Sequence, residues 1–154
     1  MITINNELEL SIPEDFREMS ADEKAGLQMS SHGESICLKA PERHMVISIG
    51  WKKNGLLSKL LSGGDFAEEL DSCYRKAMKP FGYRRTDDIS REVDGVKADG
   101  IRYEYTAQDI GMTGESMGLK KDNEIYYFHV YYRTMYSDTG RDVWNGILDS
   151  AKWK

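Results

Sequence analysis

The segment from Glu124 to Arg133 constrains the fold of this chain more than any other stretch of its sequence. It reads Glu-Ile-Tyr-Tyr-Phe-His-Val-Tyr-Tyr-Arg, and aromatic and β-branched residues of this kind favour extended backbone. Successive side chains of a strand point to opposite faces of a sheet. One predicted face carries Tyr126, Phe128, Val130 and Tyr132, and the other carries Tyr127, His129, Tyr131 and Arg133. We interpret the first face as core and the second as a candidate interaction surface.

A predicted amphipathic helix follows this aromatic strand. Ser137 or Asp138 is the expected N-cap, because both residue types accept hydrogen bonds from the free N–H groups at a helix start. Apolar residues then recur at helical spacing, and they are Val143, Trp144, Ile147, Leu148 and Ala151. The helix is therefore expected to pack on a sheet.

The rest of the chain defines the fold class. Apolar patterns predict strands at residues 7–12, 35–39, 44–52, 83–89, 96–107 and 113–121, with a hairpin connection at 40–43 and a flexible segment at 108–111. Helices are predicted at 20–26, where Ser20 and Glu23 match a capping box, and from an N-cap at Asp65 to Pro80, after a loop over 53–63. Strands precede and follow the middle helix without alternating with helices. We therefore predict an α+β fold with a single, mostly antiparallel sheet of about six or seven strands flanked by helices.

Length and charge narrow the class of protein. The 154 residues suit a single domain, and a formal net charge of −5 argues against nucleic-acid binding, which needs a dense basic surface. No apolar run reaches the ~18–20 residues of a membrane span, and the N-terminus has no signal-peptide pattern. We therefore expect a cytoplasmic protein.

Cys37 and Cys73 are predicted to be buried free thiols, with a disulfide between them as the alternative.

The histidines show no metal-binding pattern. His32, His44 and His129 are isolated in the sequence, and none forms the close-spaced pairs with His or Cys that are typical of metal sites. The glycine-rich motifs that hold nucleotide phosphates are also missing from the sequence. No metal site and no cofactor is therefore predicted.

One short motif is similar to that of serine hydrolases. Gly114-Glu-Ser-Met-Gly118 matches the pattern G-x-S-x-G, in which a sharp turn between a strand and a helix exposes the nucleophile. Here the motif lies within a predicted strand that ends in a turn, so its context differs. A small hydrolase that uses Ser116 with His129 as its base is an alternative function, and no residue is assigned as catalytic.

Two further groups of side chains indicate binding. Met112 and Met117 lie in a glycine-rich segment, and methionines make adaptable apolar surfaces, so both join the candidate interaction surface. Tyr103, Tyr105 and Trp144 are candidates for lining an aromatic pocket between sheet and helix. Such a pocket would make the protein a binder of small ligands.

The order of the elements is also informative. An opening strand runs into Ser11-Ile-Pro-Glu-Asp-Phe16, a middle helix begins near Phe66, and an aromatic strand and a helix ending near Ser150 precede Lys152-Trp153. This plan resembles the PsbP-like superfamily, with its Mog-like and DcrB-like members. The resemblance implies an α/β/α sandwich with a non-enzymatic binding role, and it provides no motif from which site residues transfer. We therefore predict a bacterial-type interaction or adaptor module for a protein or peptide partner, one version being a chaperone for a secreted or membrane-bound client.

Overall fold

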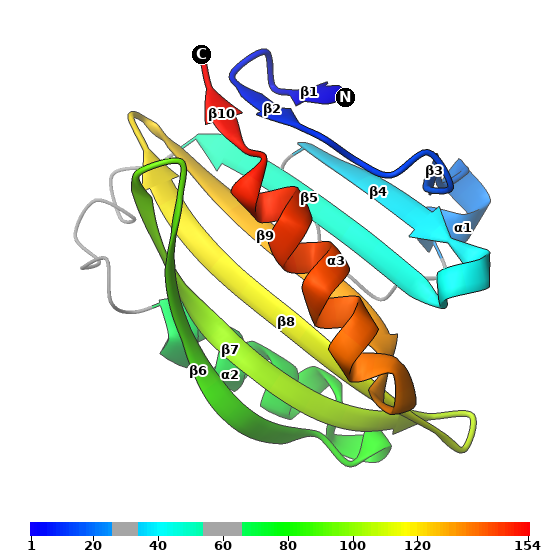
Figure 1. Ribbon diagram of the computed structural model, residues 1–154. Helices are drawn as coiled ribbons and strands as arrows, with labels where there is room; N and C mark the ends of the chain where they lie inside the picture. The colour runs from blue at the N-terminus through cyan, green and yellow to red at the C-terminus, as the bar shows by residue number, and fades with distance from the viewer. Residues whose placement is uncertain (26–33, 54–65) are drawn as a thin grey trace.

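A computed structural model describes residues 1–25, 34–53 and 66–154 (Figure 1). Within these residues, the main element is an antiparallel sheet of seven strands. From one edge to the other, they are β3 (Arg17–Glu18), β4 (Glu34–Ala40), β5 (Met45–Lys53), β9 (Glu124–Arg133), β8 (Ile110–Lys121), β7 (Val96–Ala107) and β6 (Arg84–Val93). The predicted α+β class and the predicted antiparallel sheet are confirmed.

A smaller sheet joins the two ends of the chain. It consists of β1 (Ile2–Ile4), β2 (Leu8–Leu10) and β10 (Lys152–Trp153), with β2 in the middle. The predicted strand over residues 7–12 is confirmed as the shorter β2, and β1, with which it pairs, is an additional strand outside that prediction. The two strands are separated by a turn in which Asn5 and Asn6 have φ of 53° and 55°. Asparagine tolerates this left-handed conformation better than most residues, which explains the turn.

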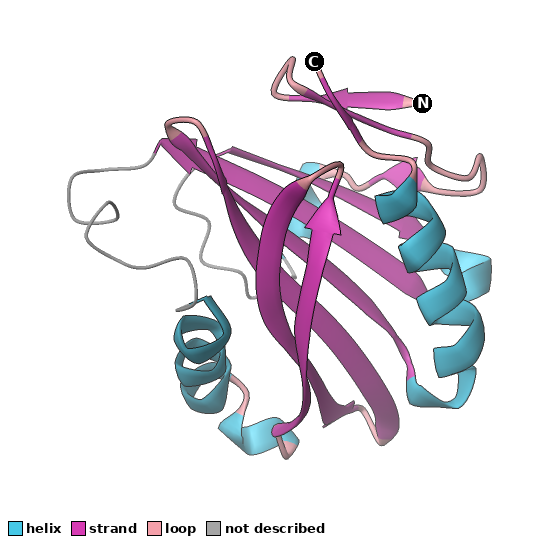
Figure 2. Cartoon of the chain, turned by 60° about the vertical axis from the view of Figure 1, so that its left-hand side comes forward, coloured by secondary structure: helices cyan, strands magenta, loops and turns pink. Residues whose placement is uncertain are grey.

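Helices cover both faces of the main sheet. α3 (Ser137–Asp149) lies across one face, and α2 (Phe66–Ala77) lies on the opposite face (Figures 1 and 2). The short helix α1 (Ala21–Ala25) and the 3₁₀ turns η1 (Pro41–Arg43), η3 (Lys79–Phe81) and η4 (Thr134–Tyr136) connect other elements. Among the residues described, no helix is long and apolar enough to cross a membrane.

One helix start follows the prediction and another does not. At α1, the Glu23 N–H donates to Ser20 Oγ at 3.2 Å and the Ser20 N–H donates to Glu23 Oε1 at 3.1 Å, which is the predicted capping box. At α3, the predicted cap by Ser137 or Asp138 is wrong. The turn η4 runs directly into the helix, and Tyr136 takes the cap position without a side-chain hydrogen bond. Lys53 of the predicted loop belongs to β5, and the rest of that loop, 54–63, lies outside the described residues, as do His32 and the N-cap at Asp65.

Tight turns set the register of the strands from β6 to β8. Asp94 and Gly95 join β6 to β7, and Gln108 and Asp109 join β7 to β8, all with positive φ. Consecutive positive φ angles match the twist of paired strands. Residues 108–111 therefore form a tight turn and the start of β8, and the prediction of a flexible segment is wrong. The predicted hairpin across 40–43 is confirmed by the pairing of β4 with β5.

The main core lies between the sheet and α3. Tyr126, Phe128, Val130 and Tyr132 are each 0% exposed, which confirms the predicted core face of the aromatic strand. Trp144, Ile147 and Leu148 of α3 belong to the same buried cluster. Burial of one such large apolar side chain stabilises a fold by about 1.5–3 kcal/mol. The side chains of α3 therefore cover the central strand of this face of the sheet.

Both cysteines are free thiols. Cys37 is buried on β4, as predicted, whereas Cys73 is exposed on α2. The prediction of a buried Cys73 is wrong because Leu70 and Tyr74 pack toward the sheet and leave Cys73 on the solvent side of the helix.

Candidate functional site

The second face of the aromatic strand carries a row of stacked rings. His129 lies between Tyr127 and Tyr131, with ring centroids 6.5 and 6.4 Å away and interplanar angles of 10° and 5°. Tyr74 of α2 meets His129 edge to face at 6.4 Å. The imidazole is only 8% exposed, while Tyr127 and Tyr131 are half-buried. The helix thus encloses the centre of this predicted surface and leaves its flanks partly accessible.

A hydrogen-bonded polar cluster lies beneath α2. Ser116 of β8 is opposite His129 in the register of β8 and β9, and its Oγ is 2.7 Å from His129 Nδ1. The Tyr74 hydroxyl is 3.0 Å from both of these atoms, and the Tyr103 hydroxyl is 2.9 Å from Ser116 Oγ. Burial lowers the pKa of His129 to about 4, so its imidazole is neutral at pH 7. Burial also raises the pKa of Tyr103 well above its usual value.

This cluster has one feature of a hydrolytic site and lacks others. The distance between Ser116 and His129 suits a nucleophile and its base. However, Ser116 is 0% exposed, so a substrate carbonyl has no access to its Oγ in this conformation. In the described part of the chain, no carboxylate is hydrogen-bonded to His129. The cluster therefore satisfies buried polar groups and holds α2 against the sheet.

The glycines of the hydrolase-like motif have a packing role. A Cβ atom at Gly114 would lie 2.4 Å from Cζ of Tyr103, and one at Gly118 would lie 2.4 Å from Cδ1 of Phe66. Any side chain at either position would collide with an aromatic ring. The two glycines are four residues apart, so they lie on the same face of β8, and each leaves room for an aromatic ring.

Met112 and Arg133 lie on one face of the sheet, and Met117 lies on the other. Met112 and Arg133 are paired across β8 and β9, and both are half-buried on the α2 side of the sheet. Met117 is five residues from Met112, an odd number, so it points to the α3 side, where it is 2% exposed within the core. The structure therefore brings Tyr127, His129 and Tyr131 together and separates Met117 from them.

The three aromatic residues predicted to line one pocket lie on opposite sides of the sheet. Tyr103 and Tyr105 pack in the cluster beneath α2, whereas Trp144 belongs to the α3 core. They do not line a common cavity, because the sheet itself separates them.

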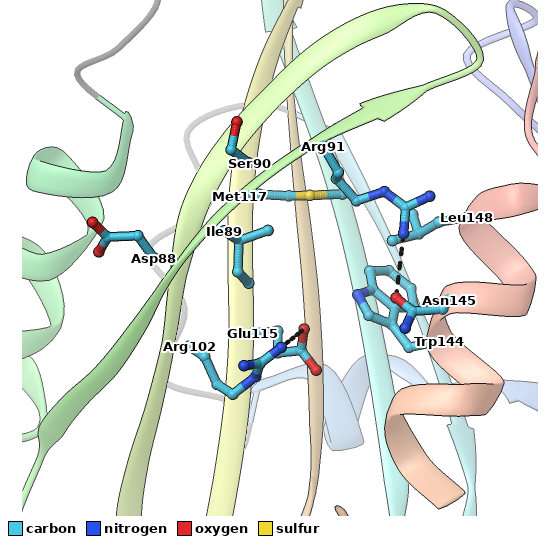
Figure 3. A pocket seen from close by; sticks show the side chains of 10 residues that line it. All are labelled: Asp88, Ile89, Ser90, Arg91, Arg102, Glu115, Met117, Trp144, Asn145 and Leu148. Atoms are coloured by element: carbon cyan, nitrogen blue, oxygen red, sulfur yellow. Dashed lines mark hydrogen bonds and ion pairs between the residues drawn. The ribbon is translucent and has the colours of Figure 1, made fainter. Parts of the chain in front are cut away.

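An open pocket lies elsewhere, between α3 and the β6 edge of the sheet (Figure 3). We name it the edge pocket; its volume is about 260 Å³, and it is lined by Asp88, Ile89, Ser90, Arg91, Arg102, Glu115, Met117, Trp144, Asn145 and Leu148. Figure 3 shows Arg91 reaching from β6 toward α3, while the Asp88 carboxylate points away from α3. The pocket thus combines four apolar side chains with six polar or charged ones.

Arginines organise the polar side of the edge pocket. Arg91 donates to Asn145 Oδ1 at 3.2 Å and to Asp149 Oδ1 at 2.8 Å, which ties β6 to α3. Arg102 donates to Asp87 Oδ2 at 3.2 Å and to Glu115 Oε1 at 3.4 Å. Its Nε is buried and has no hydrogen-bond partner among the described residues.

Glu115 is the buried acid of the edge pocket. Its side chain is 7% exposed, and its Oε2 accepts a hydrogen bond from the Tyr132 hydroxyl at 2.6 Å. Sequence reasoning missed the pocket because its lining comes from β6, β7, β8 and α3, and no local pattern shows that these segments meet. Within residues 1–25, 34–53 and 66–154, no group of three or more His, Cys, Asp or Glu side chains is arranged to hold a metal ion.

Comparison with known proteins defines the fold class as PsbP-like. No family model and no curated protein sequence matches the chain. A cyanobacterial PsbP (CyanoP) from Synechocystis sp. PCC 6803 superposes with a TM-score of 0.66 and 12% identity, over 96% of this chain and 93% of that one. LpqN, involved in cell envelope biogenesis of Mycobacterium tuberculosis, superposes with a TM-score of 0.61 and 14% identity, over 96% of this chain and 83% of that one. PA94 from Pseudomonas aeruginosa, a protein of unknown function and putative regulator, superposes with a TM-score of 0.50 and 10% identity, over 92% of this chain and 82% of that one.

Proposed function

We propose that this protein is a non-catalytic interaction module or adaptor that binds a protein or peptide partner at the edge pocket. The observation that carries this proposal is the position of the pocket, which opens beside the last strand of the sheet. A partner can reach it from solvent, whereas α2 encloses Ser116 and His129. In a chaperone-like version, the partner is an extended segment of a client protein.

The size of the pocket supports a side chain as its occupant. Sites for drug-sized ligands usually have about 300–1,000 Å³, and the edge pocket has about 260 Å³. Its apolar side chains, which include Ile89, Trp144 and Leu148, suit an apolar anchor residue of a larger partner. Burial of such an anchor in a well-packed pocket is a common source of binding energy in protein interfaces.

A selection from a random peptide library displayed on phage tests this proposal. Asn145→Trp places a large ring at the mouth of the pocket, while Asp142→Trp makes the same type of change at an exposed α3 position away from the lining. Peptides enriched on the wild type should bind Asp142→Trp equally well and lose at least tenfold in affinity for Asn145→Trp. Failure to enrich any peptide, or equal binding to both variants, would contradict the proposal.

A small hydrolase is the second candidate function, favoured by the 2.7 Å separation of Ser116 Oγ and His129 Nδ1. It requires α2 to move so that substrate reaches Ser116. Labelling with a fluorophosphonate, which reacts with activated serines, tests it. We expect the wild type and Ser116→Ala to be labelled to the same extent. Stoichiometric labelling of Ser116 would favour the hydrolase.

A further inference from the structure

The outer side of β6 is a free sheet edge. The strand order ends at β6, and within the described ranges no other strand pairs with its outer side. Figure 1 shows β6 as the outermost strand of the sheet, beyond β7. An unpaired edge presents backbone N–H and C=O groups to which another extended chain can bind.

The hairpin geometry shows which backbone groups point outward. The two-residue turn at Asp94 and Gly95 closes the hairpin on the pair Val93 and Val96, and such a turn is flanked by a hydrogen-bonded pair. Hydrogen-bonded and non-hydrogen-bonded pairs alternate along antiparallel strands. The backbone groups of Asp88, Ser90 and Glu92 therefore point away from β7. The Glu92 carbonyl among them accepts a hydrogen bond from Arg91 Nε at 3.2 Å, which an added strand would replace.

We propose that the partner binds as an extended peptide that adds to the outer side of β6 along residues 88–92. Its side chains on the α3 side would be apolar and approach the edge pocket, and those on the α2 side would be basic. This inference rests on the proposed function and specifies its partner.

The side chains of β6 support this alternating pattern. Ile89 and Arg91 lie on the α3 side and line the edge pocket, so an added strand would place every second side chain beside its mouth. Asp88 and Glu92 lie on the other side and are exposed. Asp88 is paired with Arg85, and Glu92 lies opposite Lys97 in the register of β6 and β7, with no ion pair to it within 4.0 Å. Opposite charges on paired strands stabilise the pairing, and the net charge of −5 attracts a basic partner.

The same edge limits how long the added strand can be. The register of β6 and β7 shifts between Arg85 and Asp87, and such bulges interrupt regular pairing. A second copy of the chain is a poorer partner: antiparallel pairing centred on Ser90 would place Asp88 opposite Glu92 of that copy. Like charges in this arrangement are destabilising.

Three synthetic heptapeptides test the inference. The first is Lys-Val-Lys-Leu-Lys-Val-Lys, the second has the same composition in the order Lys-Lys-Val-Leu-Val-Lys-Lys, and the third carries Glu in place of each Lys. Only the first should bind, and it should slow hydrogen exchange of the outward amides of Asp88, Ser90 and Glu92. Equal binding of the rearranged peptide, protection elsewhere, or a peptide-independent dimer in sedimentation would overturn the inference.

Two variants and one control sharpen this test. Ser90→Pro removes the central outward N–H, a change that a solvent-facing edge position tolerates, and Glu92→Lys reverses the charge opposite the peptide. Each should weaken binding of the first peptide at least tenfold, while Asp142→Lys, with the same charge change on α3, should bind like the wild type. If phage-selected peptides depend on Asn145 but not on Ser90 or Glu92, the strand-addition mode fails and the proposed function stands. If no peptide is selected, the proposed function itself fails.

Discussion

Ser116 and His129 face each other on neighbouring strands, with Oγ and Nδ1 2.7 Å apart, yet both are buried beneath α2. The groups around the imidazole are the hydroxyls of Ser116 and Tyr74 and the rings of Tyr127 and Tyr131, none of which is charged at neutral pH. The pair thus forms a neutral hydrogen-bonded unit within a packed layer.

The buried imidazole should make stability depend on pH. Burial lowers the pKa of His129 from its usual value near 6.5 to about 4, so between these values the unfolded chain binds the proton more tightly. Stability contributed by this residue is complete above pH 6.5 and falls toward pH 4, by about 3 kcal/mol. Urea unfolding of the wild type and His129→Gln at pH 7.5 and pH 4.5 measures it. The variant should lose less stability than the wild type over this range, and equal losses would show that His129 does not carry the effect.

Two glycines should respond in opposite ways to alanine. Gly118→Ala places a Cβ atom 2.4 Å from the ring of Phe66 and should destabilise the fold by about 1–3 kcal/mol, because the ring or α2 must move. Gly146 lies in α3, and no heavy atom lies within 4 Å of the place that a Cβ atom would occupy there, so Gly146→Ala should stabilise by about 0.5–1 kcal/mol. Urea unfolding measures both. Equal effects of the two substitutions would contradict the packing role of Gly118.

The acid in the edge pocket should matter more than a surface acid. Glu115→Ala removes a buried acceptor from the Tyr132 hydroxyl and one of the two carboxylates paired with Arg102, at a cost of about 1.5–3 kcal/mol. Glu104→Ala breaks an exposed pair with Arg84 and should cost less than about 1 kcal/mol. Thermal or urea unfolding of both variants provides the comparison. Similar small losses would mean that Glu115 is not energetically coupled to its neighbours.

The two thiols should differ in reactivity. Cys73 is exposed and Cys37 is buried, and thiol reagents need access to the sulfur. An absorbance assay with a disulfide reagent should titrate one thiol rapidly in the folded protein and both in denaturant. Cys73→Ser should abolish the rapid phase, and its persistence in that variant would contradict the assigned exposures.

Local periodicity was sufficient for most of the fold but not for the site. The alternation from Tyr126 to Tyr132 predicted which side of the aromatic strand is buried, since strand side chains alternate with a period of two. The same rule, applied to Met112 and Met117, would have separated them, but both were grouped by their glycine-rich context. Tyr103 and Trp144 were grouped by residue type, although the sheet lies between them.

The amino-acid sequence was enough to predict the long strands and the two amphipathic helices, because their patterns depend on neighbours within a few residues. It did not predict the tight turn at Gln108 and Asp109 or the short strands β1, β3 and β10. The enclosure of His129 by α2, its contact with Ser116, and the pocket between β6 and α3 became visible in the folded chain. These outcomes depend on which face each helix covers and on where the sheet order ends. Both are set by contacts between segments far apart in the chain, such as Arg91 with Asp149, which no local pattern encodes.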